Sequence, residues 1–226
     1  SHCSVYVLQF PVEIPEHVGH QLRNLIPSAL GGRALLHLFN YDQLILLEDC
    51  TPGRYPPDAV DFFAALAEPM RQRFGLAPEA GGSGAIYDRY SQVENSYQEA
   101  LTVIRLKRTF PHILRGVRRY PELGFYRLLP DLAKDYTDYV HPGLVKLAAY
   151  DRKHHGNLLA TLEAYLSCDC RMKETADVLH IHENTLSYRL KRIAEIGGIN
   201  LNSMDERTSC YLEIRIRQFV EDGKGG

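Results

Sequence analysis

Tryptophan is absent from this chain of 226 residues, which has only five cysteines and three methionines. Uninterrupted apolar runs stay well below the roughly 18 residues that a membrane helix needs, so we expect no membrane segment. Charge of one sign is not in excess, because 26 basic residues oppose 28 acidic ones for a formal net charge of −2. With 45% hydrophobic residues, the composition excludes a disordered tail and predicts a soluble protein of one large or two small domains.

The cysteines are odd in number and scattered, which argues against a disulfide framework. We predict free thiols and a reducing, cytoplasmic location. Cys168 and Cys170 form a C-x-C pair with histidines nearby in the sequence, but a zinc site usually takes two paired sets of ligands. We interpret this pair as a polar turn between helices, and we expect no metal and no other cofactor.

The chain begins at Ser1-His2 without an initiator methionine or the apolar core of a signal peptide. We interpret it as a piece of a longer protein that has a further domain upstream.

The first half alternates strand-like and helix-like segments. β-Branched, aromatic and alternating apolar residues predict strands at Ser4–Phe10, Arg33–Phe39, Gln43–Asp49 and Gly82–Asp88. Helical spacing predicts helices at Glu16–Leu30 and Asp58–Phe74 and a third that starts at Ser91. This β-α-β-β-α-β order, followed by a helix, is the split βαβ pattern, in which helices cover one face of a four-stranded antiparallel sheet.

Two local features refine these expectations. Pro69 lies inside the second predicted helix and should kink or divide it. Ser91 and Glu94 have the spacing of a capping box at the start of the third.

A basic stretch, Arg105–Arg119, contains six lysines and arginines and no acidic residue. One interpretation is a solvated linker, or a patch that pairs with acids elsewhere in the fold. The other is a strip that follows a phosphate backbone. The sequence leaves both open.

From Gly124 onward every segment has helical spacing, so the predicted fold class is α+β, a βαββαβ domain followed by an all-helical bundle. Within this bundle, residues 172–196 have the pattern of a helix-turn-helix. Ala176 is small enough for two helices to cross closely, and Leu186 fills the wedge between them. His180 occupies the turn position that often requires a positive φ.

The second helix of this motif has a core side and a polar side. Placing Leu186, Leu190 and Ile193 toward the core turns polar residues outward. Amide, hydroxyl and basic side chains can bind base edges and phosphates, so we predict DNA binding by His182, Asn184, Thr185, Ser187, Tyr188, Lys191 and Arg192.

Charge alone does not favour this interpretation. Glu183 to Ile196 holds three bases and two acids, a net of +1, and a helical hairpin used only for packing is the alternative. Arg189 leans toward the core side. An ion pair with Glu174 or Asp177 and a phosphate contact are equally compatible with its position.

Thr161–Phe219 closely resembles the C-terminal helix-turn-helix of the PucR/CdaR family of bacterial transcriptional regulators. The specific part is Ala176–Leu190, ADVLHIHENTLSYRL, and the segments Ser96–Leu101 and Tyr120–Leu129 resemble the GGDEF-related domain that precedes this module in the family.

The resemblance implies a degenerate GGDEF-like domain with its basic junction at residues 1–119 and a helical DNA-binding domain at 120–226. It also implies a sequence-specific regulator of double-stranded DNA that acts as a dimer or larger homo-oligomer, with an unknown small-molecule effector sensed upstream. Because a helix-turn-helix dimer matches its two-fold axis to that of its DNA site, we predict that the site is an inverted repeat.

GGDEF relatives include nucleotide cyclases, so an enzymatic function needs a test. A cyclase holds divalent metal with acidic side chains in the central hairpin and at the end of the first strand. The hairpin here, Asn40–Gln43, lacks the glycine pair and the acids that follow it. We therefore predict no enzymatic activity, and the competing function is a non-catalytic sensor or dimerisation module whose helical domain contacts proteins.

Overall fold

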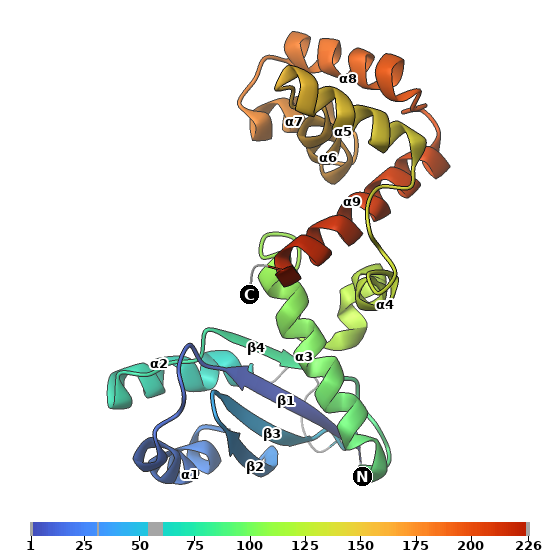
Figure 1. The fold of residues 1–226 in the computed structure, drawn as a ribbon. Helices are drawn as coiled ribbons and strands as arrows, with labels where there is room; N and C mark the ends of the chain where they lie inside the picture. Colours follow the sequence, from blue (N-terminus) through green and yellow to red (C-terminus); the bar gives the residue numbers. More distant parts are fainter. Residues whose placement is uncertain (1, 31, 54–60, 225–226) are drawn as a thin grey trace. The chain divides into compact units, whose positions relative to one another are not determined.

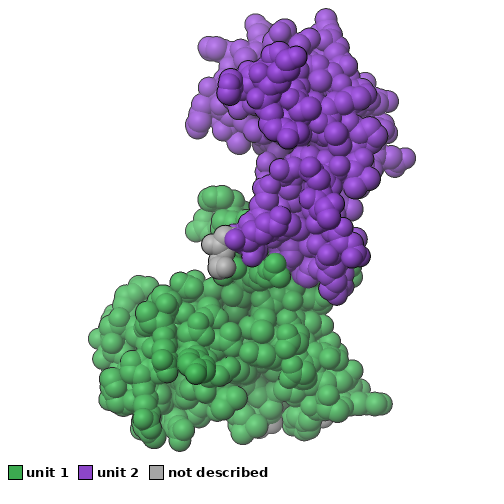
Figure 2. All heavy atoms as spheres, in the orientation of Figure 1, with its two compact units in different colours: residues 1–128 green, residues 129–226 purple. Residues whose placement is uncertain are grey.

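The computed structural model describes residues 2–30, 32–53 and 61–224. The chain divides into two compact units, residues 1–128 and 129–226 (Figure 2). The first contains an antiparallel sheet with helices and the second is all-helical, which confirms the predicted α+β class. The domain limits of 1–119 and 120–226 stay a prediction. In the part of the chain that the structure describes, no helix has the length and hydrophobicity needed to cross a membrane.

The sheet of the first unit has the strand order β2-β3-β1-β4, and every neighbouring pair is antiparallel (Figure 1). This order is the one that the split βαβ pattern predicts. The strands are β1 (Cys3–Gln9), β2 (Ala34–Asn40), β3 (Gln43–Asp49) and β4 (Ala80–Ser83). The predicted bounds of β3 are confirmed, and those of β1 and β2 differ from the structure by one residue.

Helices pack against both faces of the sheet, whereas the sequence pattern predicted cover on one face. Tyr6 and Leu8 face a core shared with α1 (Glu16–Leu30) and α2 (Phe62–Phe74). Val5 and Val7 point to the other face, where they pack with Ala100 of α3 (Val93–Thr109). The four consecutive residues Val5–Leu8 of β1 are aliphatic or aromatic, and alternate side chains leave opposite faces of a strand, so both faces require cover.

The fourth strand lies earlier than predicted, at Ala80–Ser83 instead of Gly82–Asp88. The reason is that glycines within β4 and directly after it pack closely against α3. A Cβ at Gly82 would meet Val103 Cγ1 at 2.8 Å, and one at Gly84 would lie 2.1 Å from the carbonyl oxygen of Ser96. Strand prediction depends on alternating apolar and polar side chains, and glycine has no side chain. The position of β4 could therefore not be predicted from this glycine-rich segment.

Helix α2 is continuous over Phe62–Phe74 although Pro69 lies inside it, so Pro69 does not divide the helix, and the alternative expectation of a kink stays a prediction. The side chain of Asp61 accepts a hydrogen bond from the Phe63 amide and caps the helix start. Gly75 ends it in the left-handed conformation, with φ of 64°. The predicted start at residues 58–60 lies outside the described residues.

The third helix begins two residues later than predicted. Ser91 belongs to a short 3-10 turn, η1 (Tyr90–Gln92), that precedes α3. The predicted capping box is not made, because α3 has no side-chain hydrogen bond at its N-cap, and Glu94 instead accepts from Gln98 at 2.9 Å. The extra 3-10 turn moves Ser91 out of the N-cap position that the box requires.

The basic stretch that ends at Arg119 is partly built into the first unit. Glu48 is 2% exposed and accepts hydrogen bonds from Arg33 at 2.9 Å and from Arg119 at 3.0 Å. Arg118 lies 3.9 Å from the carboxylate of Asp61. This part of the stretch therefore pairs with acids elsewhere in the fold and is not a solvated linker.

The second unit is a bundle whose core joins residues from four helices. Its helices, after η2 (Tyr120–Leu128) ends the first unit, are α4 (Leu129–Leu132), α5 (Pro142–His154), α6 (Leu158–Ser167), α7 (Met172–Leu179), α8 (Glu183–Gly197) and α9 (Met204–Lys224). Leu144, Leu162, Ile193 and Cys210 are fully buried in one cluster. Ser203 accepts a hydrogen bond from the Glu206 amide at 3.3 Å, which caps the start of α9.

Candidate nucleic-acid interface

A left-handed turn joins α7 to α8. His180 has φ of 53° and ψ of 44°, which confirms the conformation expected for this position. Its amide donates to the carbonyl of Asp177 at 3.2 Å, and the Ile181 amide donates to Ala176 at 3.0 Å. This pair of bonds is a Schellman motif, which ends α7 sharply and lets α8 start three residues later. Ala176, 3% exposed, lies in the core, as its small size predicted.

Helix α8 buries one side and exposes the other. Leu186 and Ile193 are fully buried, Gly197 is also buried, and Leu190 is half-buried. These positions follow the helical period, so the remaining positions point outward. The core side predicted for this helix is confirmed.

The outward side carries the predicted DNA-binding residues. Tyr188 is 65% exposed, and the other exposed residues of this side are His182, Asn184, Thr185, Ser187 and Lys191. Arg192 is half-buried at the margin of this surface. The structure thus brings the predicted residues together on one helix face, while their contacts with DNA stay a prediction.

The start of α8 offers backbone donors. His182 is the N-cap, with φ of −72° and ψ of 148°, and its side chain accepts no hydrogen bond from the first turn. The first amides of a helix have no partner within the helix, and they point out of its N-terminal end. A phosphate oxygen placed here would be stabilised by these amides and by the helix dipole.

The two bases of the outward side share one carboxylate. Glu195 lies 4.0 Å from Lys191 Nζ and 3.5 Å from Arg192 Nη1. Exposed pairs of this kind are weak and screened by salt, so both bases can exchange Glu195 for a phosphate.

Tyr150 of α5 is a site residue that the sequence did not reveal. Its hydroxyl accepts a hydrogen bond from Arg192 Nη2 at 3.2 Å, and the guanidinium carbon lies 5.6 Å from the ring centroid. This hydrogen bond raises the pKa of Arg192. The two residues are 42 positions apart, and no local pattern connects them. Tyr150 holds Arg192 beside the exposed side of α8.

Arg189 makes neither of the ion pairs considered from the sequence. Its guanidinium donates to the hydroxyl of Thr161 on α6 at 3.3 Å. Glu174 instead accepts from Arg171 at 2.6 Å. Arg189 lies on the side of α8 that faces α6 rather than α7, which is why the acids of α7 are not its partners.

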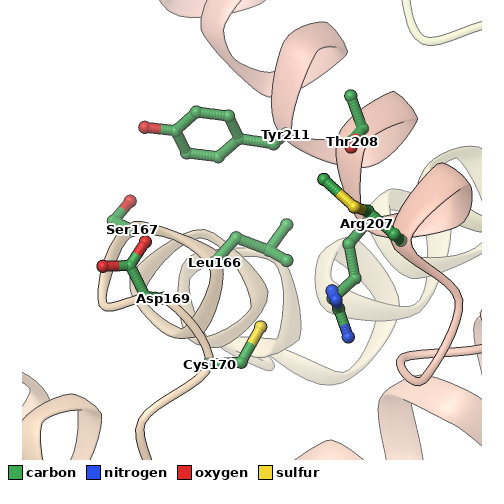
Figure 3. A pocket seen from close by; sticks show the side chains of 8 residues that line it. Leu166, Ser167, Asp169, Cys170, Arg207, Thr208 and Tyr211 are labelled. Atoms are coloured by element: carbon green, nitrogen blue, oxygen red, sulfur yellow. The ribbon is translucent and has the colours of Figure 1, made fainter.

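The Cys168-x-Cys170 segment forms the turn between α6 and α7, as its interpretation as a polar turn predicted. Asp169 and Cys170 have φ of 52° and 61°, both in the left-handed region. Beside this turn, residues of the α6 end and of α9 line a hollow of about 400 Å³, with Cys170 on one wall and Arg207 on the other (Figure 3). One nitrogen of Arg207 donates to the carbonyl of Leu201, which anchors that side chain within the unit.

Two helices joined by a tight left-handed turn, the second with an exposed polar side, define a helix-turn-helix protein. Residues 158–216 match the family model of the PucR C-terminal helix-turn-helix domain. The chain therefore contains a PucR-type helix-turn-helix domain, and its homologues are transcriptional regulators of the PucR/CdaR family.

Curated relatives support the same family. The chain is 31% identical over 221 residues to the DNA-binding transcriptional activator AdeR of Bacillus subtilis. The aligned region covers 97% of this chain and 52% of AdeR. It is 34% identical over 137 residues to the proline-responsive transcriptional activator PutR of the same organism. This alignment covers 60% of this chain and 33% of PutR. The carbohydrate diacid regulator of Escherichia coli is 33% identical over 99 residues, 43% of this chain and 25% of that protein.

The chain therefore spans about half the length of AdeR and less of the other two. These relatives are regulators and activators of transcription, and the family consists of such regulators rather than enzymes. This confirms the prediction that the chain is not an enzyme.

Proposed function

We propose that this chain is the DNA-binding part of a transcriptional regulator and that α8 lies in the major groove of double-stranded DNA. The observation that supports the proposal is the outward side of α8, where an amide, three hydroxyls and two bases are exposed or half-exposed along one helix. A helix of this diameter fits the major groove, where base pairs present distinct patterns of donors and acceptors.

The residues have separate roles in this proposal. Asn184, in the first turn, hydrogen-bonds adenine, and Lys191 and Arg192 bind guanine or phosphate. Thr185, Ser187 and Tyr188 donate to phosphate oxygens. His182, together with the first amides of α8, binds a phosphate at the helix N-terminus.

Two copies of the regulator would present their α8 helices to successive major grooves. A helix-turn-helix dimer matches its two-fold axis to that of its DNA site, so we propose that the target is an inverted repeat. The first unit, which we propose to be a degenerate GGDEF-like domain, sets the spacing of the two helices or couples it to a small-molecule effector sensed upstream. The protein would act in the cytoplasm.

Selection of bound duplexes from a random pool at physiological salt tests the proposal. The expected result is one sequence motif with two-fold symmetry and half-sites about one helical turn apart. Asn184→Ala should relax the preference at one base pair by about 1–3 kcal/mol, and Lys191→Ala should lower the salt slope of binding by about 1.

Two results together would contradict the proposal that α8 reads DNA. If the pool yields no motif, and if Asn184→Ala and Lys191→Ala bind like the parent at every salt concentration, α8 is not the reading helix. The helical unit would then serve protein contacts, which pull-down with a second tagged copy of the chain would detect.

A further inference from the structure

Helix α8 has few charges with which to bind a phosphate backbone. Lys191 and Arg192 share the carboxylate of Glu195, and Arg189 is turned toward Thr161. Specific DNA binding usually draws much of its affinity from several phosphate contacts by lysine and arginine. If α8 binds DNA, additional bases should lie beside it.

Helix α5 runs alongside α8 in the opposite direction (Figure 1). At one end of the pair, a Cβ on Gly143 would lie 3.0 Å from the carbonyl oxygen of Gly197. Further along, Tyr150 accepts the hydrogen bond from Arg192. These two contacts fix which side of α5 faces α8, and they place the C-terminal end of α5 beside the N-terminal half of α8.

The side of α5 that carries Tyr150 is basic. Lys146 and Lys153 lie four residues before and three residues after Tyr150, a spacing that puts all three on one helix side. Both lysines are exposed, and the ring of His154 packs against the Tyr150 ring with centroids 4.4 Å apart. Arg152 is also exposed, but two residues from Tyr150 is a rotation of about 200°, which places it on the opposite side.

No acid of α5 neutralises these lysines. Asp151, the only carboxylate in the helix, accepts hydrogen bonds from the amides of Leu158 and Leu159 at 3.0 and 2.9 Å. Among the residues that the structure describes, neither Lys146 nor Lys153 forms an ion pair within 4.0 Å. Two uncompensated positive charges therefore lie next to the margin where Tyr150 holds Arg192.

We propose that Lys146 and Lys153 form a second phosphate-binding site, which contacts the phosphodiester backbone beside the groove occupied by α8. This proposal rests on the proposed function. Seven residues of helix span about 10 Å, so the two ammonium groups reach different phosphates of one strand. Tyr150 is the positioning residue that joins this site to Arg192.

A salt titration of DNA binding tests the proposal with the whole chain and the duplex selected for the parent. The double variant Lys146→Gln, Lys153→Gln should lower the slope of log affinity against log salt by about 0.9 per lysine. Its preferred sequence should stay unchanged, because phosphate contacts carry no base information. Arg152→Gln, with the same loss of charge on the other side of α5, should keep the parent slope.

A double variant with the parent slope and unchanged thermal stability would overturn the proposal, while a lowered slope for Lys191→Ala would leave the proposed function standing. An equal loss in Arg152→Gln would also overturn it, because the effect would then come from total charge. Recovery of the slope in Lys146→Arg, Lys153→Arg would support it. A parent that binds no DNA would overturn both proposals.

Discussion

Gly143, at the start of α5, lies against Ile199, two residues after the end of α8. A Cβ on Gly143 would lie 2.5 Å from Cγ1 of Ile199, well inside van der Waals contact. Ile199 is 2% exposed and belongs to the main core of the helical unit, so it has little space to move. The approach of α5 to α8, on which the position of Tyr150 depends, thus requires glycine here.

We expect Gly143→Ala to destabilise the protein by about 1–3 kcal/mol, because the added methyl group overpacks a filled core. Urea denaturation followed by circular dichroism measures the change. Gly116→Ala is the matched control, since a Cβ there meets nothing within 4 Å. Equal stability of the two variants would show that the helices can separate without cost.

A second prediction concerns the turn of the helix-turn-helix. His180→Gly should leave stability unchanged or raise it by up to about 1 kcal/mol, because glycine enters the left-handed region without strain. His180→Val should lower it by about 1–2 kcal/mol, since a β-branched residue is poorly tolerated there. Val178→Gly, at an exposed position of α7, should instead be destabilising. Thermal unfolding of the three variants separates these outcomes.

The buried carboxylate of the first unit gives a third prediction. Glu48→Gln should cost about 3–5 kcal/mol, because Arg33 and Arg119 lose the charge that compensates them in a site where Glu48 is 2% exposed. Glu68→Gln removes an exposed partner of Arg71 and should change stability by less than about 1 kcal/mol. Guanidinium titration gives both values, and a small loss for Glu48→Gln would refute the prediction.

The fourth prediction concerns the order in which the cysteine thiols react. Burial raises the pKa of Cys210 to about 12, and burial together with Glu48 raises that of Cys50 to about 12. Only the thiolate is nucleophilic, so at pH 8 these thiols are ionised in roughly one molecule in ten thousand. We expect iodoacetamide to modify the half-exposed Cys168 and Cys170 first in the native protein.

Peptide mass spectrometry after timed alkylation measures the order of modification. Because the raised pKa values depend on the fold, alkylation in guanidinium should remove the difference among the cysteines. Rapid native labelling of Cys210 would contradict the prediction.

Sequence periodicity predicted α1 and β3 with the bounds that the structure has, because their apolar residues recur with the spacing of a helix and of a strand. It also predicted the outward side of α8, since Leu186 and Ile193 determine where Tyr188 and Lys191 point. The helix-turn-helix, including the left-handed backbone conformation of His180, could be predicted for the same reason. Each of these depends on residues close together in the chain.

Other features were decided by contacts between distant segments. The position of β4 depends on how closely Gly82 approaches Val103, and a glycine shows no pattern of its own. The hydrogen bond between Tyr150 and Arg192, and with it the basic side of α5 beside α8, exists only once the bundle has folded. Local spacing thus determined which helix presents a polar side. Packing across the core decided which other residues lie next to that side, because no local pattern connects side chains that are 42 positions apart before the chain has folded.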